Sequence, residues 1–231
     1  MVDAFRAGDT PLSSPGLAPR TTVTLVEAYE EALRIAARPE QAAVVAEMHA
    51  IFEGRTGHFG PDDAWFEARS RAFWDDALTR QGFAERVAPE MPAGARAWRF
   101  GTAHRGLFHV VRDSRTGEAP LLLADVWSGA ELVVDEVDPA SRDAIHAAVA
   151  PFDGRVVARE TPLSLGLLPG AVFHPAEALL AMGLVLDAGK KGKLATHDFL
   201  DALLRMERAL RTLSRVKPAY AYRPEALHAR G

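Results

Sequence analysis

The spacing of the apolar residues changes twice along this chain, and these changes limit the folds that it can adopt. Up to about residue 90, and again from residue 175, apolar residues recur at the spacing of helices, whereas over residues 96–168 they alternate as in strands. Helices followed by strands and then by helices favour an α+β protein over a parallel α/β sheet. We therefore expect an N-terminal three-helix cluster, a central, mostly antiparallel small sheet or barrel, and C-terminal amphipathic helices.

The same changes divide the chain into five regions. We expect a flexible leader rich in Pro, Gly and Ser, a helical region, a β-rich region with one inserted helix, a pair of C-terminal helices and a basic tail. These regions span residues 1–20, 21–90, 91–174, 175–216 and 217–231, respectively.

Local signals predict where the elements begin and end. Thr24 and Glu27 have the spacing of a capping box, and Asp138 before Pro139 has the pattern of a helix start. The expected helices span residues 24–38, 39–54, 61–82, 138–149, 175–188 and 196–216. The expected strands span residues 96–102, 106–112, 120–127, 130–137, 154–160 and 163–168, with turns at residues 113–118 and a two-residue hairpin at residues 128–129.

The charge of the chain is divided unevenly. Residues 190–231 contain 10 Lys and Arg against 4 Asp and Glu, whereas the preceding residues contain 17 against 27. All four lysines of the chain lie in this last segment. Such an asymmetry is typical of a docking segment, and the alternative is that the basic tail docks on its own acidic body or on a second copy of it.

The last expected helix has one apolar face and one basic face. Its apolar positions include Phe199, Leu203 and Met206, and its arginines fall on the opposite arc. The alternative to a binding surface is a solvated face whose arginines are half neutralised by i,i+4 pairs, namely Asp201 with Arg205 and Glu207 with Arg211.

Aromatic residues on the third expected helix supply a second candidate surface. Trp is enriched at binding hot spots, although aromatic residues most often pack in cores. The candidate partner-binding residues are Lys190, Lys191, Lys193, Arg208, Arg211, Arg215, Lys217, Trp65 and Trp74.

No motif of the sequence predicts catalysis. The absence of Cys excludes thiolate chemistry, and neither a phosphate-binding loop nor a nucleophile elbow nor a metal-ligand spacing is present. We therefore expect no catalytic residue, no metal and no cofactor. The alternative is a site assembled from distant residues such as His109, Asp125 and His174 in the β-rich region.

The first expectation is a non-enzymatic, cytoplasmic protein-interaction or regulatory protein that uses its basic C-terminal segment to bind another protein or a second copy of itself. Nucleic-acid association through the same segment is one alternative, and the acidic remainder of the chain argues against it. A hydrolase or ligand-binding protein with a site in the β-rich region is the other. No apolar stretch approaches the length of a membrane span, and the first residues lack the pattern of a signal peptide.

Overall fold

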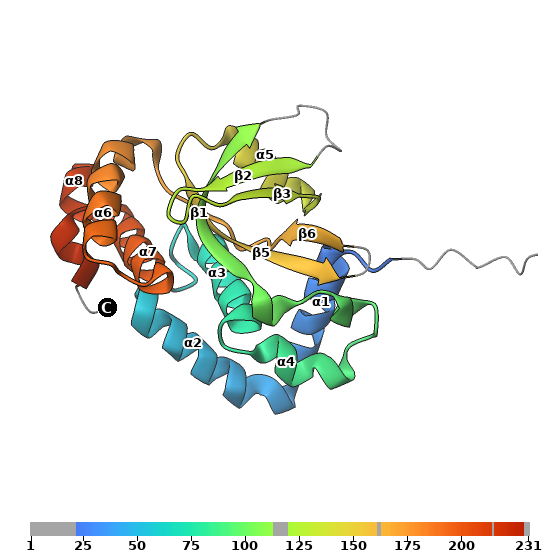
Figure 1. Ribbon diagram of the computed structural model, residues 1–231. Coiled ribbons are helices and arrows are strands. Elements are labelled where there is room, and N and C mark those ends of the chain that lie inside the picture. Colours follow the sequence, from blue (N-terminus) through green and yellow to red (C-terminus); the bar gives the residue numbers. More distant parts are fainter. Residues whose placement is uncertain (1–21, 113–119, 161–162, 214, 229–231) are drawn as a thin grey trace, which may run out of the picture.

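The structure, a computed structural model, describes residues 22–112, 120–160, 163–213 and 215–228. A mixed, mostly antiparallel sheet follows the N-terminal helices in the chain and precedes the C-terminal helices, and both groups of helices pack against it and against each other (Figure 1). This arrangement confirms the predicted α+β class with helices at both ends of the chain. The leader predicted at residues 1–20 and the turn predicted at residues 113–118 fall outside the described residues.

Local capping begins the N-terminal region. The Thr24 hydroxyl accepts from the Glu27 backbone N–H at 3.2 Å, and the Glu27 carboxylate accepts from the Thr24 N–H at 2.8 Å, so the predicted capping box is formed. The helices that follow are α1 (Leu25–Ala36), η1 (Pro39–Gln41), α2 (Ala42–Thr56), α3 (Phe66–Thr79), α4 (Phe83–Val87) and η2 (Ala88–Glu90).

Helix α3 begins later than predicted because the chain turns before it. The Asp63 carboxylate accepts from the Gly60 N–H at 2.9 Å, and the Asp63 N–H donates to the Gly60 carbonyl, which closes a turn where a first helical turn was expected. Gly82 ends this segment in a left-handed conformation with φ 75°, and α4 then continues the chain.

The strand predicted over residues 96–102 is wrong. This stretch contains two short 3-10 turns, η3 (Ala95–Ala97) and η4 (Phe100–Thr102), whose hydrogen bonds are local. Only Trp98 makes a β-bridge, to Arg159, and the guanidinium of Arg159 lies 5.0 Å from the centre of its ring. The stretch therefore contacts β5 at Trp98 and at Arg99, whose N–H donates to the Ala158 carbonyl, while its apolar side chains fill the N-terminal core.

The sheet has the strand order β3-β2-β1-β5-β6-β4, and β7 also pairs with β5. Its pairs are antiparallel except the short pair of β4 with β6. Because β3 and β4 lie at opposite ends of this order but are separated only by Asp135, the sheet curls strongly. The strands are β1 (His104–Arg112), β2 (Leu121–Asp125), β3 (Glu131–Val134), β4 (Glu136–Val137), β5 (Phe152–Glu160), β6 (Leu163–Leu167) and β7 (Val172–Phe173).

The hairpin between β2 and β3 is formed, but its loop is longer than predicted. It spans residues 126–130, and Gly129 adopts φ 78°. Asp125 holds this loop, because its carboxylate accepts from the N–H groups of Trp127 and Ser128 and from the Ser128 hydroxyl.

The remaining helices surround the sheet. Asp138 caps α5 (Pro139–Ala147) as predicted, accepting from the N–H groups of Ala140 and Ser141. The C-terminal elements are η5 (Ala176–Ala178), α6 (Leu179–Lys191), α7 (Thr196–Thr212), α8 (Pro218–Ala221) and η6 (Pro224–His228).

The basic tail is part of the folded body as far as residue 228. Tyr222 and Leu227 are buried with Leu203 and Met206 of α7 in an apolar cluster. The tail therefore docks on its own chain through apolar contacts rather than through its charges alone.

Candidate functional site

The arginines of α7 cover the C-terminal end of α2. A guanidinium nitrogen of Arg205 donates to the Arg55 carbonyl, and Nε of Arg208 donates to the His58 carbonyl. The last carbonyls of a helix lack partners inside that helix, so these side chains satisfy the end of α2. The basic face of α7 is therefore partly covered rather than wholly solvated.

Beside these contacts lies a cavity of about 780 Å³, here called the C-terminal groove. It is walled by the last turns of α2 and α7 and by α8 and η6. Its apolar lining consists of Ala50, Gly54, Met206, Ala209, Leu213, Tyr220, Ala221 and Ala226. A cavity of this size, largely apolar with a few polar groups, is typical of a binding site.

The polar lining of the groove is mainly cationic. Arg205, Arg208 and Arg223 line it together with one carboxylate among the described residues, Glu53. Glu53 lies 2.7 Å from Nδ1 of His58. Burial lowers the pKa of Arg205, but a guanidinium stays charged at any physiological pH. The groove therefore carries an excess of positive charge.

Two large apolar side chains stand exposed at the groove. Leu213 is 50% exposed and Tyr220 is 67% exposed. Leu213 belongs to the predicted apolar face of the last helix. Its exposure shows that other elements do not cover this face at the C-terminal end of α7. An exposed Tyr beside arginines has the composition of a protein-binding hot spot.

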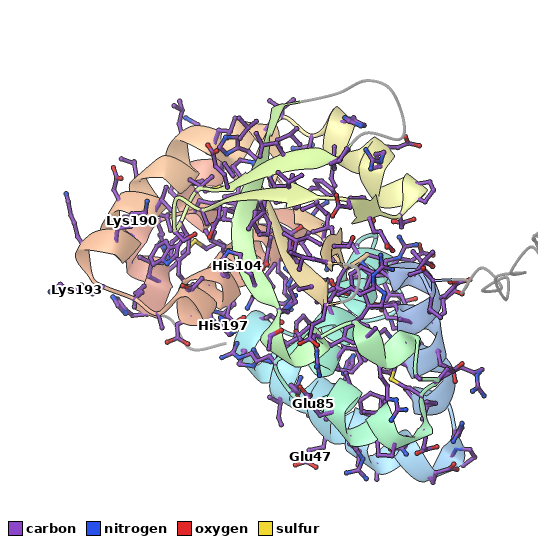
Figure 2. The ribbon with its side chains drawn as sticks, turned by 45° about the vertical axis from the view of Figure 1, so that its right-hand side comes forward. Glu47, Glu85, His104, Lys190, Lys193 and His197 are labelled. Atoms are coloured by element: carbon purple, nitrogen blue, oxygen red, sulfur yellow. The ribbon has the colours of Figure 1, made fainter. Side chains whose placement is uncertain are left out.

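The predicted basic surface is divided in the structure. Lys190, Lys191 and Lys193 lie around the turn between α6 and α7, and Nζ of Lys190 donates to the Val126 carbonyl at 3.0 Å. Arg208 lies toward the other end of α7, a helix of 17 residues whose length is about 25 Å. Figure 2 shows Lys190 and Lys193 on the outer side of the C-terminal helices. The sequence thus predicted one cationic surface where the fold makes two.

The other basic candidates have separate environments. Arg211 forms an ion pair with Glu207, as the i,i+4 spacing predicted. Arg215 is exposed with φ 62°, and Lys217 precedes α8. Among these three residues, none lines the groove.

The two tryptophan candidates lie away from the groove. Trp65 precedes α3 and lines a separate cavity with Phe173, and Trp74 packs against Phe73 beside the N-terminal core. Both side chains are half-buried. Core packing therefore accounts for much of the surface of Trp74, whereas Trp65 lines a cavity outside the core clusters of the described residues.

A feature that the sequence reasoning missed lies at the centre of the molecule, where charged side chains from both helical regions and the sheet meet. We call it the buried network, and it consists of Arg55, Arg80, Arg105, Arg155, Asp76, Asp153 and Asp201.

Arg105 on β1 is the innermost member of the buried network. It binds both carboxylate oxygens of Asp153 at 3.0 and 2.6 Å, and it binds Oδ1 of Asp201 at 2.6 Å. Its side chain is only 2% exposed. Although burial alone would lower the pKa of Arg105, Asp153 and Asp201 raise it above its ordinary value. These contacts attach α7 to the sheet.

The other aspartates attach the N-terminal helices. Asp76 on α3 binds Arg155 at 2.9 Å and also binds Arg55, and Asp201 binds Arg80 at 2.8 Å. Burial opposes ionisation of Asp76 and Asp201, but the neighbouring arginines hold the pKa of each carboxyl below its usual range. Asp201 thus binds Arg105, Arg80 and Arg55, and the pair with Arg205 predicted from spacing is wrong.

The site proposed for the β-rich region is not assembled from the residues that the sequence indicated. Asp125 pairs with His104, at 3.2 Å, and His174 pairs with the Tyr222 hydroxyl, at 2.8 Å, while His109 is exposed. Burial lowers the pKa of His174 to about 4, so this imidazole is neutral at physiological pH. The Asp125 carboxylate accepts hydrogen bonds from the loop between β2 and β3, so Asp125 has a structural role.

In the described part of the chain, no three His or carboxylate side chains approach closely enough to hold a metal ion. Within the same ranges, no helix is both long and apolar enough to cross a bilayer.

Comparison of the chain with protein-family models finds no match, and comparisons with curated proteins and with solved structures find none either.

Proposed function

We propose that this protein is a non-enzymatic binding protein whose C-terminal groove takes a segment of a partner protein that combines acidic and large apolar side chains. The observation that carries the proposal is the lining of the groove, where an apolar floor meets three arginines and one carboxylate among the described residues. We also propose that the protein is cytoplasmic, as expected from the sequence.

The apolar part of the groove supplies affinity. Leu213 and Tyr220 expose large apolar surfaces beside Met206 and Ala209, so a bound side chain would bury apolar area on both sides. Burial of apolar area contributes roughly 25 cal/mol per Å² before the costs of association are subtracted. A partner residue such as Leu or Phe fits this requirement.

The arginines supply selectivity. Arg205 and Arg208 are held by carbonyl groups and Arg223 is exposed, and within the described residues none of the three forms an ion pair, so carboxylates of a partner can bind these guanidinium groups. Opposite charges across an interface favour the correct partner and raise the association rate. A nucleic acid fits less well, because the lysines around α6 lie away from the groove and the chain as a whole has a net charge of −4.

The test is a selection from a library of displayed 12-residue peptides on the intact protein, followed by fluorescence anisotropy with the selected peptides. We expect sequences with Asp or Glu near Leu or Phe. Arg223→Glu should abolish their binding, and Tyr220→Ala should weaken it at least about tenfold. Lys191→Glu is the matched control, since it makes the same change of charge on an exposed residue outside the groove.

Two outcomes would overturn the proposal. One is a set of selected peptides without acidic residues, or binding that Arg223→Glu leaves unchanged. The other is tight binding of a single-stranded oligonucleotide probe that falls steeply with salt and is lost in Lys191→Glu, which would favour nucleic-acid association through the α6–α7 turn.

A further inference from the structure

A second cavity lies on the other side of α2. It has a volume of about 560 Å³ and is lined by Met48, Ile51, Arg55, Arg80, Gln81 and Arg86, among others. Two of these arginines, Arg55 and Arg80, also belong to the buried network. This second cavity is therefore the place where the network opens to solvent.

The arginines of the second cavity have hydrogen-bonding capacity left. In the described part of the chain, the Arg80 side chain is bonded only through Nη1, to Asp201, and the Arg86 side chain only through Nε, to Gln41 at 3.4 Å. A guanidinium has five N–H donors, so both groups can donate further bonds into the cavity. Oxyanions are the acceptors that match the planar fork of arginine.

The charge behind the cavity is not balanced. The buried network contains four arginines and three aspartates, which leaves one positive charge in excess at the centre of the molecule. Asp75 is the nearest further acid on α3; burial raises its pKa to about 7, so near neutral pH it supplies only part of a charge. An anion at the open end of the network would complete the balance.

His197 lies near the arginines of the buried network. It lies at the start of α7, where the C-terminal helices meet the N-terminal helices (Figure 2). Burial is the largest cause that lowers the pKa of His197, and Arg105 and Arg80 lower it further. Glu47 is the only carboxylate among the described residues that line the second cavity; it is exposed, and Figure 2 shows it at the outer side of α2.

We propose that the second cavity is a binding site for a small oxyanion, such as a phosphate group, held by Arg80 and Arg86 at the open end of the buried network. The group is free phosphate or the phosphate of a small ester. This site is distinct from the C-terminal groove, because the two cavities share no lining residue.

The experiment is isothermal titration of the intact protein with inorganic phosphate, with sodium chloride at matched ionic strength as the reference. We expect saturable binding of one phosphate and a rise of the thermal midpoint that chloride does not reproduce. Arg86→Gln should weaken phosphate binding roughly tenfold, since it removes a charged donor. Arg86 is exposed, so this variant is expected to fold.

The control is Arg223→Gln, which makes the same change in the C-terminal groove and should leave phosphate binding intact. Titrations with glucose 6-phosphate and with AMP distinguish a phosphate ester from free phosphate, and tighter binding of an ester would identify that class. The absence of saturable binding of any of these probes would overturn the proposal. Equal losses in Arg86→Gln and Arg223→Gln would also overturn it, because they would indicate general attraction to a cationic surface.

Discussion

The arginines of the buried network and those of the C-terminal groove carry the same charge but have different partners. Arg105 and Arg155 are bound by aspartates and are almost fully buried, whereas Arg205 and Arg208 are bound by backbone carbonyls and reach a cavity. A buried charge needs a counter-charge, and a partly exposed one does not. Arg105 and Arg155, which are buried and bound by acids, therefore hold the fold together, whereas arginines that reach a cavity can still bind a ligand.

The largest effect is expected where one aspartate serves several arginines. Asp201→Asn leaves Arg105 buried with half of its carboxylate partners removed, and it also releases Arg80. Breaking a buried pair from one side costs about 3 to 5 kcal/mol of unfolding free energy. Urea denaturation measures this loss. A loss of unfolding free energy below about 1 kcal/mol would show that the arginines of the buried network do not stabilise the fold more than those of the C-terminal groove do.

The pH dependence of stability sharpens the same comparison. Burial raises the pKa of Asp75 to about 7 in the folded protein, so between about pH 4 and 7 the folded state holds a proton that the unfolded chain releases. Stability from this group is complete below about pH 4 and is lost as the pH rises to 7, by at most about 4 kcal/mol. The difference in unfolding free energy between wild type and Asp75→Asn should follow this course.

Subtracting the unfolding free energy of Asp75→Asn from that of the wild type isolates the contribution of Asp75, because both proteins contain His174. The lowered pKa of His174 acts in the opposite direction, removing stability as the pH falls from about 6.5 to 4. Parallel pH profiles for the two proteins would show that Asp75 is ionised in the folded state throughout this range.

Substitution of a glycine at the C-terminal groove is expected to lower the unfolding free energy moderately. Gly57 adopts φ 94° and ψ 149°, and a Cβ there would lie 2.8 Å from Cδ of Arg208. Gly57→Ala should cost about 1 to 3 kcal/mol through backbone strain and should displace Arg208 from the groove. Gly54→Ala is the matched control, since it lies inside α2 with nothing within 4 Å of its Cβ, and it should stabilise the helix by about 1 kcal/mol. Thermal denaturation of both variants tests the contrast.

The smallest effect is expected at the exposed groove residues. Tyr220→Ser and Arg223→Gln should change the unfolding free energy by less than about 0.5 kcal/mol, because both side chains are exposed. Urea titrations check this result. A loss above 1 kcal/mol in either variant would mean that the groove residues maintain the fold as the network does.

Element ends could be predicted from the sequence where the signal is local. Thr24 bonds with Glu27, and Asp138 bonds with the first turn of α5. The bonded residues lie within three positions of each other, so the local sequence is sufficient to predict these caps. The order of helices and strands followed from the spacing of apolar residues. The strand prediction failed at residues 96–102 because so short a stretch has too few apolar positions to distinguish a strand from consecutive turns.

The buried network could not be predicted in this way. Asp153 and Arg155 occur two positions apart on one strand, a spacing that also suits a solvated sheet face. Arg155 pairs with Asp76 on α3, and Asp153 binds Arg105, which also binds Asp201 on α7. These partners lie far away in the sequence, so no local spacing predicts them. The groove was predicted only as a basic helix face, because its walls come from α2 and α7, which are far apart in the sequence.

Helix α2 forms a wall of both cavities, and one of its residues reaches toward each. The Arg55 carbonyl accepts from Arg205 on the side of the C-terminal groove, and the same residue lines the second cavity. A ligand in one cavity that shifts Arg55 changes the free energy with which a ligand binds in the other cavity. By thermodynamic linkage, phosphate would alter peptide affinity by the same factor by which peptide alters phosphate affinity, so each titration repeated in the presence of the other ligand measures one coupling constant twice.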